Sequence, residues 1–260
     1  MLEFTDVTIQ YGNTIAVQDF NLTINAGEIV SIVGESGSGK TTIIRSALGL
    51  LPGNGRVVAG DIRFDGVSLL KLSTAEWLTL RGNRLSMIFQ DSGAMINPVR
   101  KIGAQFVEYI QTHKPTSKSE ALEKAKHMLA AMRLPDPERI MKSYPFELSG
   151  GQRQRVGIAF AMTFNPQLLL ADEPTSALDV TTQAQIVRQM INLRREHHTG
   201  IVIVTHNLGV AAYMADRILV MREGRIVEIG TRDEILKHAS DPYTLKLLDA
   251  VPTLEGERYV

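Results

Sequence analysis

The feature that most constrains how this chain folds is a glycine-rich loop, GESGSGKT, at residues 34–41. It matches the phosphate-binding pattern G-x-x-x-x-G-K-[ST], follows the apolar run Ile29 to Val33 and opens a helical pattern from Thr41 to Leu50. Glycines let the backbone turn tightly and direct its N–H groups at a phosphate. The alternative is a plain strand–helix turn, and the flanking elements favour nucleotide binding. The predicted binding residues are Gly34, Ser36, Gly37, Ser38, Gly39, Lys40, Thr41 and Thr42.

Four short apolar runs predict the central sheet. Each is largely unbroken by polar residues, which is typical of strands buried on both faces of a parallel sheet. They are Ile29 to Val33, Leu85 to Phe89, Leu168 to Ala171 and Ile201 to Val204. Helical patterns between them include Thr41 to Leu50, Ser117 to Met132 and Thr182 to Arg195. Because strands alternate with helices, we predict an α/β fold with a doubly wound sheet.

The ends and the middle of the chain differ from this alternation. Residues 1–30 and 61–67 resemble shorter antiparallel strands, and residues 218–221 and 225–229 flank the hairpin signal Glu223-Gly224. We therefore expect a P-loop NTPase core with an antiparallel β subdomain and an inserted helical subdomain. The predicted parts are 1–90 (first part of the core, with the β subdomain), 91–160 (helical subdomain), 161–232 (second part of the core) and 233–260 (C-terminal extension).

Polar residues follow the buried runs where ligands bind in an open parallel sheet, outside the carboxyl ends of its strands. Asp172 ends a Walker B-like strand and would hold Mg²⁺, together with Thr41. Glu173 would take a proton from the attacking water, His206 would contact the γ-phosphate, and Gln90 would bind Mg²⁺ or the water. Taken singly, such acids are often helix caps and such histidines are structural. Their joint occurrence with the phosphate loop favours phosphoryl transfer to water.

Composition excludes several other classes of protein. The 28 basic and 28 acidic residues leave no formal net charge, which argues against a nucleic-acid coat. Cysteine is absent, so a disulfide framework, a thiolate metal site and a cysteine nucleophile are excluded. The N-terminus lacks a signal-peptide pattern, and no apolar run approaches the roughly 18 residues that span a bilayer. We expect a cytoplasmic domain whose membrane role would require a partner.

A second glycine-rich segment, Leu148 to Gln152, reads LSGGQ and opens another helical pattern. With the phosphate loop upstream and the Walker B-like strand downstream, it resembles the signature of ABC-type ATPases. The resemblance implies that two cassettes close head to tail over two ATPs, so that Ser149 and Gly151 contact the opposite γ-phosphate. Residues 176–179 match the D-loop. The further binding residues that it implies are Tyr11, Val17, Gly150, Gln152 and Asp179.

The 59-residue interval from Gln90 to Ser149 resembles the compact helical subdomain of a transporter cassette. Residues 144–147 (YPFE) and 240–248 (SDPYTLKLL, followed by Pro252) are similar to segments of peptide and nickel importer ATPases. Residues 92–96 and Asp241 depart from that group's pattern, and the cysteine-rich C-terminal segment of many long members has no counterpart. The expected solutes are peptides or nickel and other metal chelates.

The resemblance also implies partners. We expect integral membrane permease subunits, a second cassette that is identical or a paralogue, an indirect role for a substrate-binding protein, and a peripheral place on the cytoplasmic face of the membrane. Residues 91–106 are the predicted permease contact, although Met95, Ile96 and Val99 could instead be core. No nucleic acid is expected. The alternatives are a non-transport ABC ATPase acting on nucleic acid or ribosomes, and a nucleotide-gated binding module with negligible turnover.

Overall fold

A computed structural model describes residues 1–176, 178–250, 253–254 and 257–258 of the chain. Its contacts divide it into two compact units. The core unit comprises Met1–Glu76 and Gly200–Val260, and the helical unit comprises Trp77–Thr199. The predicted four-part division remains a prediction. No helix among the described residues has the length and apolar character needed to cross a membrane.

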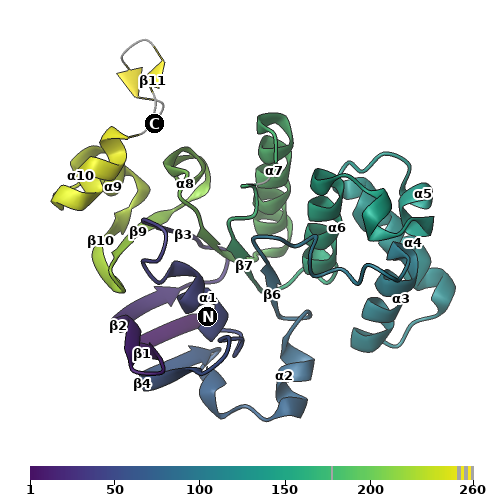
Figure 1. Ribbon diagram of the computed structural model, residues 1–260, viewed down its shortest axis with the longest axis horizontal. Coiled ribbons are helices and arrows are strands. Elements are labelled where there is room, and N and C mark those ends of the chain that lie inside the picture. The colour runs from purple at the N-terminus through teal and green to yellow at the C-terminus, as the bar shows by residue number, and fades with distance from the viewer. Residues whose placement is uncertain (177, 251–252, 255–256, 259–260) are drawn as a thin grey trace. The chain divides into compact units, whose positions relative to one another are not determined.

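The core unit contains an antiparallel sheet of order β2-β1-β4-β5, whose strands β1, β2 and β4 lie side by side in Figure 1. Its strands are β1 (Leu2–Tyr11), β2 (Thr14–Ile24), β4 (Gly55–Phe64) and β5 (Val67–Ser68). The antiparallel arrangement was predicted, but β1, β2 and β4 are longer than expected, since each has 10 or 11 residues. The buried rings of Phe4 and Phe20 pack edge to face, with 5.3 Å between their centres. Aromatic pairs of this geometry stabilise a core.

The phosphate loop follows a second set of strands in the core unit, in the order β10-β9-β3-β8. They are β3 (Ile29–Val33), β8 (Gly200–Val204), β9 (Arg217–Arg222) and β10 (Arg225–Thr231). Strand β3 pairs in parallel with both β8 and β9, and β9 pairs antiparallel with β10. The predicted hairpin is confirmed. Strand β9 also joins the parallel sheet, because its apolar residues are buried on both faces.

Short helices complete the core unit. They are α1 (Lys40–Ser46), α8 (Leu208–Met214), α9 (Arg232–His238) and α10 (Pro242–Asp249), with the 3-10 turn η1 (Leu69–Lys71) and the short strands β11 (Thr253–Leu254) and β12 (Glu257–Arg258). Helix α1 ends at Ser46 rather than at Leu50 as predicted. Helices α8, α9 and α10 pack with β9 in one apolar cluster, which includes Val33 at the end of β3. The C-terminal helices are therefore part of the core that supports the phosphate loop.

The helical unit contains a parallel strand pair and a group of helices, which Figure 1 shows in teal and green. The elements are β6 (Leu85–Ile88), β7 (Leu168–Asp172), α3 (Ile102–His113), α4 (Lys118–Ala131), α5 (Pro137–Lys142), the 3-10 turn η2 (Pro145–Glu147), α6 (Gly150–Met162) and α7 (Val180–His197). Helix α2 (Thr74–Leu80) spans the boundary of the two units in sequence. The predicted capping box of α4, Ser117 with Glu120, is confirmed. Phe106 of α3 stacks on Phe160 of α6 at 4.0 Å.

Candidate active site

The phosphate loop is shaped by close contact with β9 and β2. A Cβ atom at Gly34, where φ is 148°, would lie 2.1 Å from the backbone oxygen of Met221. At Gly39, where φ is 98°, it would lie 2.9 Å from both the carbonyl of Ala16 and a methyl of Val17. Only glycine fits such positions without strain. The buried side chain of Val17 thus lies close to the loop at Gly39.

The loop surrounds the ammonium group of Lys40, and the residue as a whole is only 6% exposed to solvent. Its Nζ donates to the carbonyls of Gly34 at 2.8 Å and Glu35 at 2.6 Å, and to the Ser38 hydroxyl at 3.4 Å. Helix α1 begins at Lys40 and carries no acidic residue in its first turn. A buried cation beside a positive helix end fits an anionic ligand such as a triphosphate.

Two more predicted residues of the core unit lie at strand ends, one in each of its two sheets. Strand β8 pairs Val204 with Ile32 of β3, so the exposed His206 follows β8 at the same edge as the phosphate loop. Tyr11 ends β1 and is half-buried, and a Cβ at Gly55 would lie 2.4 Å from its ring. The glycine therefore leaves space for this aromatic ring.

The helical unit brings together Gln90 and Glu173. Strands β6 and β7 are parallel and in register from Leu85 with Leu168 onward, so both residues emerge at one edge. Gln90 Nε2 donates to Glu173 Oε2 at 3.4 Å. Glu173 has a φ of 44°, in a region that non-glycine residues rarely adopt, and it directly follows the fully buried Asp172. Backbone strain of this kind is typical of functional sites.

Gln154 was not among the predicted site residues, and the structure places it at a junction of the helical unit. Its side chain is 3% exposed, and its Oε1 accepts from Ser92 N–H at 3.0 Å while its Nε2 donates to the Pro174 carbonyl at 3.3 Å. It thus connects helix α6 with the segment after Gln90 and with the residue after Glu173. The available signal was its helical spacing from the buried Ile158 and Ala161, which puts Gln154 on the buried face, where an amide must find partners.

The signature segment begins helix α6. The Ser149 hydroxyl accepts from Gln152 N–H at 3.3 Å, and Gln152 Oε1 accepts from Ser149 N–H at 3.0 Å, so the two form a capping box. A Cβ at Gly150 would meet nothing within 4 Å, and one at Gly151 would make only ordinary contact with Leu178, at 3.5 Å. The packing of this chain therefore does not require either glycine.

Asp179 has a local role as the N-cap of α7. Its carboxylate accepts from Thr182 N–H at 3.0 Å and from the Thr182 hydroxyl at 2.7 Å, and these bonds lower its pKa. Of the predicted D-loop, Ala177 lies outside the described residues, as does Pro252 of the C-terminal segment. Because Asp179 is exposed, it can cap α7 and still be accessible to a nucleotide.

The residues predicted to hold Mg²⁺ provide suitable donor atoms. Thr41 has a hydroxyl, Gln90 an amide oxygen and Asp172 a carboxylate, and Mg²⁺ prefers such oxygen ligands. Within the described residues, no group of three or more His, Cys, Asp and Glu side chains could hold a metal ion. In proteins Mg²⁺ is usually held by one or two side chains together with substrate phosphates.

The predicted residues fall into two sets. Those in the core unit are Tyr11, Val17, Gly34, Ser36, Gly37, Ser38, Gly39, Lys40, Thr41, Thr42 and His206. Those in the helical unit are Gln90, Ser149, Gly150, Gly151, Gln152, Asp172, Glu173 and Asp179. The structure brings Lys40 into contact with Gly34 and Ser38, and Gln90 with Glu173. The roles of these residues remain predictions.

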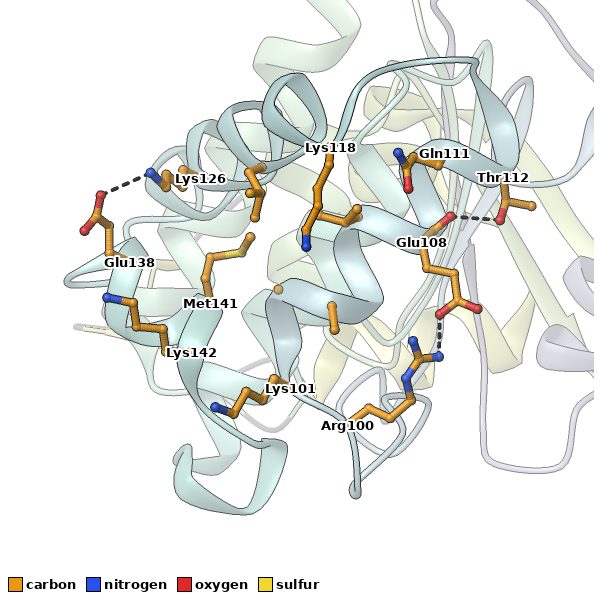
Figure 2. A pocket seen from close by; sticks show the side chains of 14 residues that line it. Arg100, Lys101, Glu108, Gln111, Thr112, Lys118, Lys126, Glu138, Met141 and Lys142 are labelled. Atoms are coloured by element: carbon orange, nitrogen blue, oxygen red, sulfur yellow. Dashed lines mark hydrogen bonds and ion pairs between the residues drawn. The ribbon is translucent and has the colours of Figure 1, made fainter.

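A groove of about 990 Å³ lies between helices α3, α4 and α5 of the helical unit. Figure 2 shows its rim, where Arg100 pairs with Glu108 and Lys126 with Glu138. Lys118 and Lys142, also on the rim, have no acidic partner within the part of the chain that the structure describes. The apolar lining comprises Ala104, Val107, Leu122 and Met141. The groove therefore combines apolar walls with an excess of positive charge.

The chain is similar to known proteins. The ABC transporter family model matches residues 17–176. The oligopeptide transport ATP-binding protein OppD of Salmonella typhimurium is 45% identical, over 99% of this chain and 78% of that protein. The dipeptide transport ATP-binding protein DppD of Lactococcus lactis is 42% identical, over 94% of this chain and 70% of that protein.

A solved structure is also similar. It is the dimeric post-hydrolysis state of the ATP-binding cassette MJ0796 bound to ADP and Pi, with a TM-score of 0.80 and 30% identity over 89% of this chain and 99% of that one. The family match covers more than half of the chain, and it includes the phosphate loop, the signature and the Walker B strand. The chain belongs to the ABC transporter family and is one of its ATP-hydrolysing cassettes.

Proposed function

We propose that this chain is the ATPase subunit of a peptide importer, which couples ATP binding and hydrolysis to uptake through a membrane permease. The observation that carries the proposal is 45% identity to an oligopeptide transport ATP-binding protein across 99% of the chain. Both oligopeptide and dipeptide relatives support peptides as the solute class. Nickel and other metal chelates remain a prediction from the sequence, whereas the peptide class is supported by these relatives.

The proposed reaction is attack of water on the γ-phosphorus of ATP, which breaks the bond to the β-phosphate oxygen and yields ADP and Pi. Glu173 takes a proton from the attacking water, and Gln90, 3.4 Å away, orients that carboxylate. Lys40 holds phosphate oxygens, and His206 contacts the γ-phosphate. Bound Mg²⁺ would neutralise charge on the phosphates, with Thr41, Gln90 and Asp172 as its protein ligands.

We further propose that the reaction needs a second cassette. Gly150 and Gly151 are not required by this chain's own packing, since Cβ atoms there would meet no close neighbour. Glycines there leave the backbone open to close approach by a group from outside the chain. The triphosphate held by an opposite cassette is that group in the proposal, with Ser149 beside it. The second cassette is an identical chain or a paralogue.

The permease is proposed to contact residues 91–106 and the adjoining groove. Met95 and Val99 are 65% and 78% exposed, whereas Ile96 is 6% exposed and belongs to the core. Exposed apolar side chains of this size favour a contact with another protein. The unpaired Lys118 and Lys142 favour an acidic partner segment. We propose that this contact holds the cassette at the periphery of the membrane on its cytoplasmic face, with a substrate-binding protein acting through the permease.

Reconstitution tests this function. The full chain is assembled in lipid vesicles with the permease subunits that co-purify with it, and uptake of labelled di- and oligopeptides is measured with ATP on the cassette side. ATP-dependent uptake that is lost with Glu173→Gln supports the proposal. Hydrolysis stimulated by nucleic acid or ribosomes without a membrane partner would instead support the soluble ATPase. Negligible hydrolysis in the full assembly would support the binding module.

A further inference from the structure

The C-terminal helix α10 reaches the phosphate loop through one side chain. The hydroxyl oxygen of Tyr243 accepts a hydrogen bond from the backbone N–H of Glu35 at 2.9 Å. Glu35 is the second residue of the glycine-rich loop, and 208 residues separate the two positions in sequence. Both belong to the core unit. This bond links helix α10 directly to the glycine-rich loop.

The ring that carries this hydroxyl is firmly held. Tyr243 is 6% exposed and belongs to the apolar cluster that also contains Val33, the residue just before the loop. The guanidinium carbon of Arg222, at the end of β9, lies 5.1 Å from the centre of the ring. A fixed ring presents its hydroxyl at a defined point, because tyrosine then has little freedom to move.

The backbone around Tyr243 is also fixed. Asp241 caps α10 by accepting from the N–H groups of Tyr243 at 2.8 Å and Thr244 at 3.2 Å. The residue before it, Ser240, donates its N–H to Glu228 of β10 at 2.7 Å. A continuous chain of bonds therefore runs from β10 through the start of α10 to the phosphate loop.

Glu35 is held on both sides. Its carbonyl accepts from Lys40 Nζ at 2.6 Å and from Ser38 N–H at 3.2 Å, while its N–H is occupied by Tyr243. Lys40, which is predicted to bind phosphate, and Tyr243 of α10 thus both bond to Glu35. Because its N–H is already bonded, Glu35 serves to fix the start of the loop.

We propose that Tyr243 is a positioning residue for ATP binding, which holds Glu35 so that the loop and Lys40 are preorganised for the phosphates. The C-terminal segment of this cassette is then part of the nucleotide site. The inference depends on ATP binding by this chain and on neither the solute nor the permease, so its failure leaves the transport proposal intact.

The test compares Tyr243→Phe with Tyr213→Phe in the full chain. Tyr213 is a 63% exposed tyrosine on α8. Isothermal titration with MgADP should give about 2–10-fold weaker binding for Tyr243→Phe, the effect of one lost neutral hydrogen bond, and an unchanged constant for Tyr213→Phe. Without nucleotide, hydrogen exchange at the Glu35 amide should be faster only in Tyr243→Phe. Unchanged affinity together with unchanged exchange would overturn the proposal.

A packing variant separates positioning from general stability. Leu236→Ala removes apolar contacts from the same cluster but keeps the Tyr243 hydroxyl. It should lower the melting temperature more than Tyr243→Phe does, yet bind MgADP within about twofold of the parent, because the bond to Glu35 remains. Asp241→Ala, which removes the cap of α10, should give an intermediate rise in exchange at Glu35. Equal loss of affinity in Leu236→Ala and Tyr243→Phe would refute a specific role for the hydroxyl.

Discussion

Gln90 Nε2 lies 3.4 Å from Glu173 Oε2, and the two residues follow adjacent parallel strands of the helical unit. Parallel strands in register deliver their carboxyl ends to one edge, which explains why residues 83 positions apart meet there. The left-handed backbone of Glu173, with a φ of 44°, adds a strained turn at that edge. This pair is the part of the predicted catalytic site that the structure brings together in the helical unit.

Glu173→Gln should keep ATP binding and lower turnover about 10²–10⁴-fold, the usual range for a lost general base. The amide retains the shape of the side chain but cannot accept the proton from water. Steady-state phosphate release and equilibrium nucleotide binding are measured on the same preparation. Hydrolysis near the parent rate would remove Glu173 from its assigned role.

Gln154→Leu should lower both stability and turnover. The change leaves Ser92 N–H and the Pro174 carbonyl without the buried amide that bonds them, at a cost of about 1–3 kcal/mol in the free energy of unfolding. Turnover should fall because the segments after Gln90 and Glu173 lose their common support. Urea unfolding and ATP hydrolysis check the two effects, with the half-buried Gln189→Leu of α7 as the control. A variant as stable and active as this control would contradict the role.

Glu228 should make the core unit sensitive to acid. Burial acts to raise the pKa of this carboxyl, but the hydrogen bonds from Ser240, Thr244 and the Asp241 backbone together outweigh it and leave the pKa below 4.5, its ordinary value. The folded state therefore binds fewer protons than the unfolded state. The stabilisation is fully present above about pH 4.5 and is lost as the pH falls through the folded-state pKa.

Glu228→Gln should therefore flatten the dependence of unfolding free energy on pH in this acid range. Chemical unfolding at a series of pH values is compared with that of Glu196→Gln, which alters an exposed carboxylate at the end of α7. Parallel curves for the parent chain and Glu228→Gln would count against the assignment.

Reversing the unpaired charges of the groove should uncouple the cassette from its permease. Lys118→Glu with Lys142→Glu is expected to weaken co-purification with the permease, because an acidic segment would meet like charge. ATP hydrolysis by the isolated chain should be unaffected. Lys71→Glu, an exposed lysine of η1, is the matched control. Undiminished permease binding by the double variant would exclude the groove from the contact.

Much of the fold could be predicted because its signals are local. The predicted order of strand, glycine-rich loop and helix around residues 34–41 is confirmed, and the capping box of Ser117 follows from spacing alone. The parallel role of β9 could not be predicted, since an apolar run gives no information about its neighbours. Helix α1 was predicted too long because local turn bonds replace the helical pattern after Ser46: Leu48 N–H donates to the Arg45 carbonyl and Gly49, with a φ of 60°, donates to that of Ser46.

The residues of the candidate site could be predicted from the sequence. Most of the contacts between them could not. Glu173 and Gln90 follow buried strands, so their meeting was expected from topology. Tyr243 and Gln154 were not, since each acts through a hydrogen bond to a backbone group distant in sequence. Such bonds depend on where the elements lie in space, which the spacing of residues in a motif does not predict.

The requirement for two cassettes is tested most directly by the structure of the ATP-loaded assembly that carries Glu173→Gln. We predict that Ser149 Oγ and the Gly151 N–H of one cassette lie within hydrogen-bond distance of the γ-phosphate held by Lys40 of the other. An ATP-loaded assembly in which both groups face solvent, away from any nucleotide, would contradict it.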